Sequence, residues 1–206
     1  PIFDYLGEHP DKARIFDAAM TGVHGRESDA LVAAYDFSGF GVLADIGGGN
    51  GTLISTVLKQ HPAMQGILFD LPHVVDRARA NVEAHGVADR CELVGGSFFE
   101  AVAPGANAYM MRHIIHDWDD EKSLTILRNI HRVMPDDGKL LVVESVIPPG
   151  NDPFGGKLLD LVMLLIPGGK ERTEAEYREL FSTAGFELTR IVPTATEVSV
   201  IEAVKK

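Results

Sequence analysis

The stretch Val42-Leu43-Ala44-Asp45-Ile46-Gly47-Gly48-Gly49-Asn50-Gly51 decides the fold. Its apolar first half predicts a buried strand over 42–46, and a loop with four glycines in five positions follows. A pattern with helical spacing then predicts a helix over 52–60. A strand, a glycine loop and a helix in this order predict a βα turn that binds a ligand, because residues without a Cβ let the backbone take positive φ and lie against that ligand.

Composition and charge narrow the class of protein. The chain has 206 residues, of which 45% are hydrophobic and 24% are charged, and its formal net charge is −11. This acidic balance disfavours a nucleic-acid partner, which would need clustered cations. The apolar stretch 158–166 is too short to cross a bilayer. With one cysteine, Cys91, and no signal peptide, we expect a cytoplasmic protein without membrane or nucleic-acid partners.

Apolar runs and helical patterns alternate along the chain. Strands are expected at 42–46, 66–70, 90–94, 108–112 and 139–144, in alternation with helical patterns. Helices are predicted within 1–38, with a break at 21–25, and at 158–165. Thr173 opens a last helix with a capping box. Two β-rich runs, 186–192 and 197–204, then predict a hairpin at the sheet edge.

This alternation predicts an α/β fold with a mostly parallel sheet, in which ligands gather at the carboxyl ends of the strands. Polar residues close the five strands in turn, namely Asp45, Asp70, Ser97, His116 and Glu144. We therefore expect one crevice to collect them.

The spacing of the glycines separates three kinds of loop. A P-loop needs a lysine, which this loop lacks. The dinucleotide fingerprint GxGxxG, started at Gly47, puts its third glycine at Thr52, so that spacing fails. The pattern Asp45-x-Gly47-x-Gly49-x-Gly51 resembles motif I of S-adenosylmethionine-dependent methyltransferases. Asp70 ends the second strand, where a carboxylate either accepts both hydroxyls of a ribose or caps the next helix.

Three further segments sharpen this resemblance: Phe69-Asp70-Leu71-Pro72-His73-Val74-Val75, His116-Asp117-Trp118 and Gly168-Gly169-Lys170-Glu171-Arg172-Thr173. They look like the small-molecule O-methyltransferases, in particular the plant caffeic-acid and animal acetylserotonin enzymes and their bacterial natural-product relatives. The resemblance covers essentially all of 1–206. It implies a Rossmann-like class I methyltransferase fold, with a seven-stranded, mostly parallel sheet, a C-terminal antiparallel hairpin and leading helices.

The resemblance also implies a domain organisation and a cofactor. The leading helices, 1–38, would contribute to the acceptor pocket, and 39–206 would form the catalytic domain that binds S-adenosylmethionine and releases S-adenosylhomocysteine. Family members normally carry an N-terminal winged-helix domain that forms a homodimer. That domain is expected to be absent here, because the chain begins at Pro1, without a methionine, and enters a helical pattern at once.

In the family, the histidine of the HDW motif is the general base, so the resemblance assigns that role to His116. A near-neutral imidazole can take the proton of a phenol as its oxygen attacks the sulfonium methyl. The two glutamates that orient this histidine match Glu144 and Glu171, and Asp117 joins the catalytic set as the next residue of the motif. Without these roles, Glu144 would be a strand-end surface acid and Glu171 an acid at a helix N-terminus.

The residues expected to bind the cofactor are Asp45, Gly47, Gly49, Gly51, Asp70, Leu71, Ser97, Phe98 and Arg112. Two of these positions depart from the plant enzymes. Ser97 replaces a carboxylate that would contact adenine, although Phe98 can still cover the ring, and Arg112 replaces a lysine. Cofactor binding with altered affinity is therefore expected.

The acceptor pocket is expected, by family analogy, between the leading helices with Phe16 and Met20 and the apolar helix with Met163 and Ile166. Apolar residues at helical spacing equally form cores, so core packing stays open for these four. Their character favours a flat, hydroxylated aromatic acceptor, such as a phenol. The helix itself is so apolar that it must be buried or face a partner, which fits a missing dimerisation domain.

Other interpretations stay open. His113 and His116 lie at a strand end without an obvious third ligand, so no metal site is expected, although a magnesium-dependent enzyme using acids such as Asp117, Asp119 and Asp120 remains an alternative. The chain could also keep the cofactor and catalyse decarboxylation or hydroxylation. It could, finally, be a cofactor-binding domain that is inactive without its dimerisation domain. The sequence names neither the acceptor nor the hydroxyl that is methylated.

Overall fold

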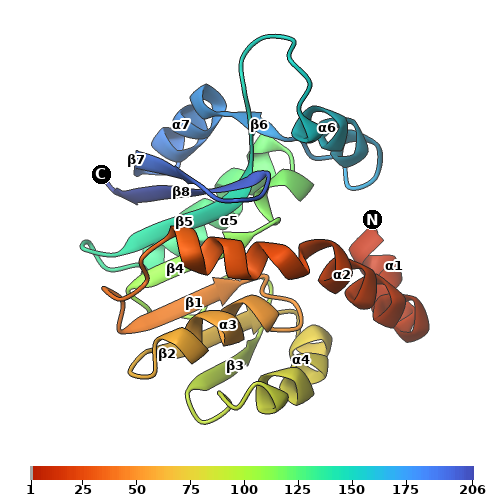
Figure 1. Ribbon diagram of the computed structural model, residues 1–206, viewed down its shortest axis with the longest axis vertical. Coiled ribbons are helices and arrows are strands. Elements are labelled where there is room, and N and C mark those ends of the chain that lie inside the picture. The colour runs from red at the N-terminus through yellow and green to blue at the C-terminus, as the bar shows by residue number, and fades with distance from the viewer. Residues whose placement is uncertain (1) are drawn as a thin grey trace.

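A parallel sheet extended by two antiparallel strands forms the middle of the structure (Figure 1). The structure is a computed structural model. It describes residues 2–206, without the side chains at positions 3, 4, 17, 21 and 23–25. The strands are β1 (Val42–Ile46), β2 (Gln65–Asp70), β3 (Cys91–Gly95), β4 (Ala108–Arg112), β5 (Lys139–Ile147), β6 (Arg172–Thr173), β7 (Phe186–Pro193) and β8 (Val198–Lys205). Seven of them lie in the order β3-β2-β1-β4-β5-β8-β7. The first five are parallel, and β8 pairs antiparallel with both β5 and β7.

Helices cover both faces of this sheet. They are α1 (Ile2–Glu8), α2 (Pro10–Ala34), α3 (Thr52–Gln60), α4 (Pro72–Ala84), α5 (Asp120–Val133), α6 (Gly155–Leu165) and α7 (Glu174–Thr183), with a short 3₁₀ turn, η1 (Ile115–Asp117). Buried side chains of α2, α3 and α4 form one core with the sheet, and those of α5 and α7 form a second core on the opposite face. Neighbouring residues of a strand pack into opposite cores, because successive side chains of a strand point to opposite faces. Leu43 and Ala44 of β1 are an example.

The predicted class of fold is confirmed, and several elements coincide with their predicted bounds: β1, β4 and α3. The capping box is present, since the Thr173 hydroxyl accepts from the Glu176 N–H while the Glu176 carboxylate accepts from the Thr173 N–H. Within residues 2–206, no helix combines the length and the apolar character that a membrane crossing needs.

Two predictions of local structure are wrong. The break expected at 21–25 does not occur, because α2 is continuous from Pro10 to Ala34; the two glycines there lower helix propensity by only about 1 kcal/mol each. The fifth strand was expected to end at Glu144, but β5 continues to Ile147. Pairing with β6 extends this strand, since Val146 of β5 lies opposite Arg172 of β6. Glu144 therefore lies inside a strand.

Candidate functional site

The glycine loop between β1 and α3 depends on backbone conformations that favour glycine. Gly47, Gly49 and Gly51 have φ values of 71°, 58° and 76°. A Cβ on Gly47 would overlap Cδ1 of Ile114, which follows β4, so this glycine lets two loops pack closely. A Cβ on Gly49 would meet nothing within 4 Å. The space beside Gly47 is therefore filled by the protein, whereas the space beside Gly49 is open.

Asp70 joins the end of β2 to this loop. Its Oδ2 accepts the Gly49 N–H at 2.8 Å, and its Oδ1 accepts the Leu71 N–H at 2.7 Å. The carboxylate is half-buried, and these two bonds hold it at a fixed angle. Leu71 leaves 36% of its surface exposed beside it. The sequence predicted this convergence of Asp70, Leu71 and the glycines, and the structure brings them together.

Asp45, the penultimate residue of β1, lies beneath the loop and is 1% exposed. Its Oδ2 has no hydrogen-bond partner among the described residues. Burial raises the pKa of Asp45 to about 7, although the charge of Arg112 acts in the opposite direction. A spare buried carboxylate oxygen, an open backbone at Gly49 and a held carboxylate at Asp70 suit a ligand with a cationic group and a ribose. The residues present thus fit S-adenosylmethionine.

Three other predicted cofactor residues lie around the same crevice with different partners. The ring of Phe98 lies 3.6 Å from the point where a Gly47 Cβ would be, and it meets the Trp118 ring edge-on at 6.2 Å. Ser97 accepts the Phe99 N–H at 3.4 Å within its own turn. Arg112 donates to the Ser28 hydroxyl of α2 at 3.1 Å. Phe98 therefore borders the loop, whereas Ser97 and Arg112 have protein partners, and their cofactor role stays a prediction.

The four predicted catalytic residues form one buried cluster. His116 is 6% exposed, and its Nδ1 lies 2.7 Å from Oε1 of Glu171 and 3.3 Å from Oε2 of Glu144. Its Nε2 lies 3.7 Å from Oδ1 of Asp117. Because a carboxylate can only accept, Nδ1 carries a proton and donates it to Glu171, which leaves Nε2 to exchange protons with a substrate.

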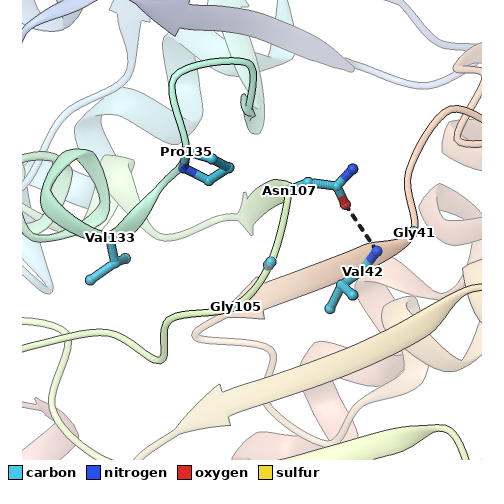
Figure 2. Close-up of a pocket in the computed structure, with 7 residues that line it drawn as sticks. Gly41, Val42, Gly105, Asn107, Val133 and Pro135 are labelled. Atoms are coloured by element: carbon cyan, nitrogen blue, oxygen red, sulfur yellow. Dashed lines mark hydrogen bonds between the residues drawn. The ribbon is translucent and has the colours of Figure 1, made fainter.

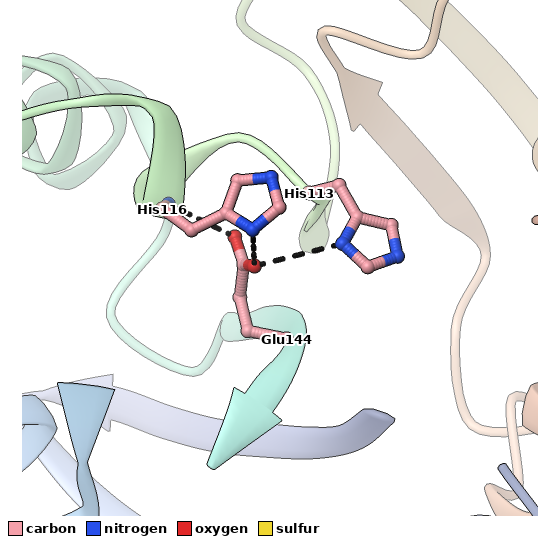
Figure 3. Close-up of side chains that lie close together, drawn as sticks. All are labelled: His113, His116 and Glu144. Carbon is pink, nitrogen blue, oxygen red and sulfur yellow. Dashed lines mark hydrogen bonds and ion pairs between the residues drawn. The ribbon is translucent and has the colours of Figure 1, made fainter. Parts of the chain in front are cut away.

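Glu144 holds the backbone of this segment. Its Oε1 accepts the N–H groups of Ile114, Ile115 and His116 at 3.0, 2.9 and 3.4 Å. These donors follow His113, a non-glycine residue with a φ of 55°, where the chain turns sharply out of β4. Figure 3 shows the Glu144 carboxylate between the two histidine rings. A carboxylate inside β5 therefore fixes both the backbone and the ring of His116.

The charges around His116 shift several pKa values. Burial lowers the pKa of His116, but Glu144, Glu171 and Asp117 outweigh burial and raise it to about 9. Burial raises the pKa of Asp117 to about 6 and also raises that of Glu144. His116 is therefore protonated near neutral pH, and it becomes a strong base once it loses that proton.

His113 faces the same carboxylate from the other side. Its Nε2 lies 2.9 Å from Oε2 of Glu27, on α2, and its Nδ1 lies 3.8 Å from Oε2 of Glu144. Burial, reinforced by the charges of His116 and Arg112, lowers its pKa well below 6.5, so this imidazole is neutral. His113, His116 and Glu144 each offer one metal-ligand atom within 4.8 Å of the others. A metal there would compete with Glu171 for Nδ1 of His116.

The predicted acceptor residues are spread over two helices. Phe16 and Met20 are half-buried on α2, and Met163 is half-buried on α6. Ile166, just after α6, exposes 57% of its surface. In α6 only Gly156 is buried, and an apolar face is open, made of Leu158, Leu161, Val162, Leu164, Leu165 and Ile166. Of the two alternatives predicted for this helix, burial within the chain is thus excluded.

A shallow depression of about 350 Å³ lies away from this crevice. Figure 2 shows it between the starts of β1 and β4 and the end of α5, where the Asn107 side chain accepts the Val42 N–H at 2.9 Å. Its lining includes Gly41, Val133 and Pro135 and no ionisable side chain. Because ligands of parallel α/β sheets bind at the opposite, carboxyl ends of the strands, this depression is not a candidate site.

Sequence reasoning missed several residues of the site. Asn81 of α4 donates to the carbonyl oxygen of Asn50, in the glycine loop, at 2.8 Å. Ile114 packs on Gly47, and Glu27 meets His113 across 86 positions. Such contacts leave no local pattern. A signal existed only for Asn50, whose side chain accepts the Thr52 N–H at 3.1 Å, as a capping residue before a helix does.

Comparison with known proteins identifies the family of this chain. Residues 1–187 match the family model of the O-methyltransferase domain. The phenazine O-methyltransferase PhzM of Lysobacter antibioticus is 47% identical over 201 residues, which are 98% of this chain and 59% of the relative. The chain thus spans about three fifths of the length of this relative.

Two solved structures share the fold closely. The crystal structure of LaPhzM superposes with a TM-score of 0.96 at 46% identity, covering 99% of this chain and 61% of that one. NcsB1, an O-methyltransferase from neocarzinostatin biosynthesis solved with S-adenosyl-L-homocysteine and 1,4-dihydroxy-2-naphthoic acid, superposes with a TM-score of 0.91 at 33% identity, covering 99% and 61%. The fold therefore has its counterpart in known proteins, and the chain belongs to the O-methyltransferase domain family.

Proposed function

We propose that this protein transfers a methyl group from S-adenosylmethionine to a hydroxyl of a small aromatic acceptor, with His116 as the general base. The observation that carries the proposal is the joining of two sites. Ile114 packs on Gly47 of the glycine loop, and two residues later His116 presents an imidazole whose Nδ1 is held by Glu171. A cofactor on the loop and an acceptor at His116 would therefore be neighbours.

The chain contributes alignment and one proton transfer. Bound S-adenosylmethionine supplies an already activated methyl group. Nε2 of His116 takes the proton of the acceptor hydroxyl as its oxygen becomes the nucleophile. The imidazolium formed is stabilised by Glu171 and Glu144, at 2.7 and 3.3 Å from Nδ1. Because the pKa of His116, about 9, approaches the ordinary value of about 10 for a phenol, the transfer is close to balanced.

The relatives support the chemical class of the acceptor. PhzM is named a phenazine O-methyltransferase, and NcsB1 was solved with a dihydroxynaphthoic acid. We infer a flat, hydroxylated aromatic acceptor for this chain, placed between α2, with Phe16 and Met20, and α6, with Met163 and Ile166. The half-buried state of three of these side chains leaves apolar surface for such a ring.

We also infer a homodimer for the active form. The six apolar residues exposed on α6 and directly after it would be costly in water, since each buried apolar Å² contributes about 25 cal/mol. A partner subunit would cover this face and close the acceptor pocket from that side. Sedimentation equilibrium tests this inference: a dimer that Leu161→Glu and Leu165→Glu convert into a monomer supports it, and a parent monomer contradicts it.

Isotope transfer tests the reaction directly. The protein is incubated with S-adenosylmethionine labelled in its methyl group and a panel of phenols, phenazinols and naphthols, and the products are analysed by mass spectrometry. A product that has gained one CH₂ carrying the isotope label supports the proposal. A product that has lost CO₂ or gained oxygen identifies one of the alternative chemistries. Cofactor binding by calorimetry without any product identifies a binding domain.

A further inference from the structure

One buried arginine joins the segments that carry His116 and Glu171. Arg172 has no exposed surface. Its Nη1 donates to the carbonyl oxygen of Ile115 at 3.1 Å, and its Nη2 donates to that of Trp118 at 3.0 Å. His116 lies between these two carbonyl groups in sequence, and Glu171 directly precedes the arginine. One guanidinium therefore links the segment that carries His116 to the segment that carries Glu171.

The guanidinium fork, that is, the Nε, Nη1 and Nη2 groups of Arg172, has further partners on α5. Oδ1 of Asp120 accepts from Nε at 3.2 Å and from Nη2 at 2.8 Å, and the Ser123 hydroxyl accepts from Nη2 at 3.3 Å. A buried guanidinium is costly unless its N–H groups are bonded, so these acceptors fix its plane. A lysine ammonium, with a single nitrogen, cannot reach acceptors in this fork geometry.

Gly169 brings the same turn against the backbone of η1. A Cβ on Gly169 would overlap the carbonyl oxygen of His116 and would lie 2.6 Å from the backbone nitrogen of Trp118. The turn 169–172 and η1 are therefore in direct main-chain contact, and the guanidinium fork lies beside this contact. The main-chain contact and the guanidinium fork both act on the relative position of η1 and the turn 169–172. Neither of them touches the imidazole of His116.

We propose that Arg172 is a positioning residue of this site. Its fork, completed by Asp120, keeps η1 and the turn 169–172 at the separation that places Nδ1 of His116 2.7 Å from Oε1 of Glu171. Without the fork both catalytic side chains remain, but their contact lengthens. The proposal rests on the function proposed above for its effect on turnover, whereas the effect on the His116–Glu171 contact is independent of any reaction.

Three variants test this role. Arg172→Lys keeps the charge and removes the fork. Asp120→Ala removes one acceptor of the fork, and because the Asp120 side chain is 55% exposed, this variant folds even where Arg172→Lys does not. Glu121→Ala is the matched control, since it removes a neighbouring acid from the first turn of the same helix. Methyl transfer, thermal unfolding and the NMR titration of the His116 ring are measured in each, with His116→Gln assigning the ring signal.

The titration separates positioning from mere stabilisation. The ionisable groups that face His116 are Glu144, Glu171, Asp117 and His113, and none of them is substituted in these variants. Lengthening the Glu171 contact is expected to lower the midpoint of His116 by about one pH unit in Arg172→Lys and by less in Asp120→Ala. We expect kcat to fall about a hundredfold in Arg172→Lys and about tenfold in Asp120→Ala, because small misplacements of reacting groups lower the rate by such factors. The KM for the acceptor should stay within about twofold of the parent value.

The outcomes decide between the explanations. A midpoint and a kcat in Asp120→Ala equal to those of Glu121→Ala would overturn the positioning role, whatever happens to the unfolding temperature. A lower unfolding temperature with an unchanged midpoint in Arg172→Lys would do the same. If the parent protein transfers no methyl group but the midpoint of His116 still shifts in Arg172→Lys, the proposed reaction is rejected and the positioning role is kept.

Discussion

Oε1 of Glu171 accepts the Nδ1 proton of His116 at 2.7 Å, although 55 positions of sequence separate the two residues. Both side chains are buried, so solvent does not screen the contact. It selects the tautomer of the ring and directs Nε2 toward the crevice. The acid–base behaviour of the protein follows from this pair and its neighbours.

We expect the reaction rate to increase with pH. His116 acts as a base only when it is neutral, and its pKa of about 9 keeps it protonated below that value. The kcat/KM for a phenol should therefore rise about tenfold per pH unit and level off near pH 9. Glu171→Gln should move the midpoint to lower pH, because it removes a negative charge. Two acceptors of different phenol pKa serve as the control: an enzyme midpoint that follows the acceptor contradicts His116 as its origin.

Glu144 should affect catalysis and folding through different oxygens. Glu144→Gln keeps an acceptor for the three backbone N–H groups that Oε1 receives, so its unfolding free energy should stay near that of the parent. Glu144→Ala leaves buried donors unsatisfied and should cost about 1–3 kcal/mol. Both variants should lose methyl transfer, since the charge beside Nδ1 is gone. Chemical denaturation and a turnover assay check this, and equal stabilities of the two variants would count against it.

Two glycines of the loop should respond differently to alanine. Gly49→Ala meets open space, so it should cost only the strain of a positive φ, about 1 kcal/mol, while placing a methyl group where the cofactor is proposed to lie. Gly47→Ala would collide with Ile114 and should unfold at a clearly lower temperature. Calorimetry with S-adenosylhomocysteine should show at least tenfold weaker binding to Gly49→Ala. Unchanged affinity would place the ligand elsewhere.

Removal of divalent metals should leave the activity intact. Nδ1 of His116 donates to Glu171, and a metal bound by His113, His116 and Glu144 would have to displace that proton. Turnover is compared in chelator-treated and untreated protein, with added Mg²⁺ and Zn²⁺ as further arms. Loss of activity in chelator that Mg²⁺ restores would support the metal-dependent alternative instead.

Glu202 should make the fold sensitive to acid. It is 4% exposed on β8, and burial, which raises its pKa, is outweighed by donors from Tyr35, Arg190, Thr189 and Lys139, which lower it to about 2. A depressed folded pKa contributes stability above the ordinary value, 4.5, and this contribution is lost as pH falls toward 2. Glu202→Gln should therefore cost about 3 kcal/mol at pH 7 and much less near pH 2.5. An equal cost at both values would contradict the assignment.

Local patterns were sufficient for much of the fold. The strand 42–46, the helix 52–60 and the capping box at Thr173 were predicted at their observed positions, because hydrophobic runs, glycines and capping residues act over a few neighbours. The convergence of Asp45, Asp70 and His116 at one edge followed from the topology of a parallel sheet. The roles of His116, Glu144 and Glu171 came from the family resemblance.

Contacts between distant segments could not be predicted in this way. The end of β5 depends on β6, 26 positions later, and the Arg172 fork reaches Asp120 across 52 positions. The pairing of Glu27 with His113 depends on how α2 lies over the sheet. The continuity of α2 shows that local patterns can also mislead. The weak local signals for a break at 21–25 did not prevail over the rest of a 25-residue helix.

The interior position of Glu144 gives the C-terminal strands a part in the chemistry. Glu144 lies opposite Ser199 of β8, and the preceding Val143 lies opposite Arg112 of β4. A slip of one residue in either ladder would turn the carboxylate to the opposite face of the sheet. The pairing of β5 with its two neighbours thus determines which side chain reaches the histidine. Damage to β8 would therefore displace the Glu144 carboxylate, which holds both the ring and the backbone of His116.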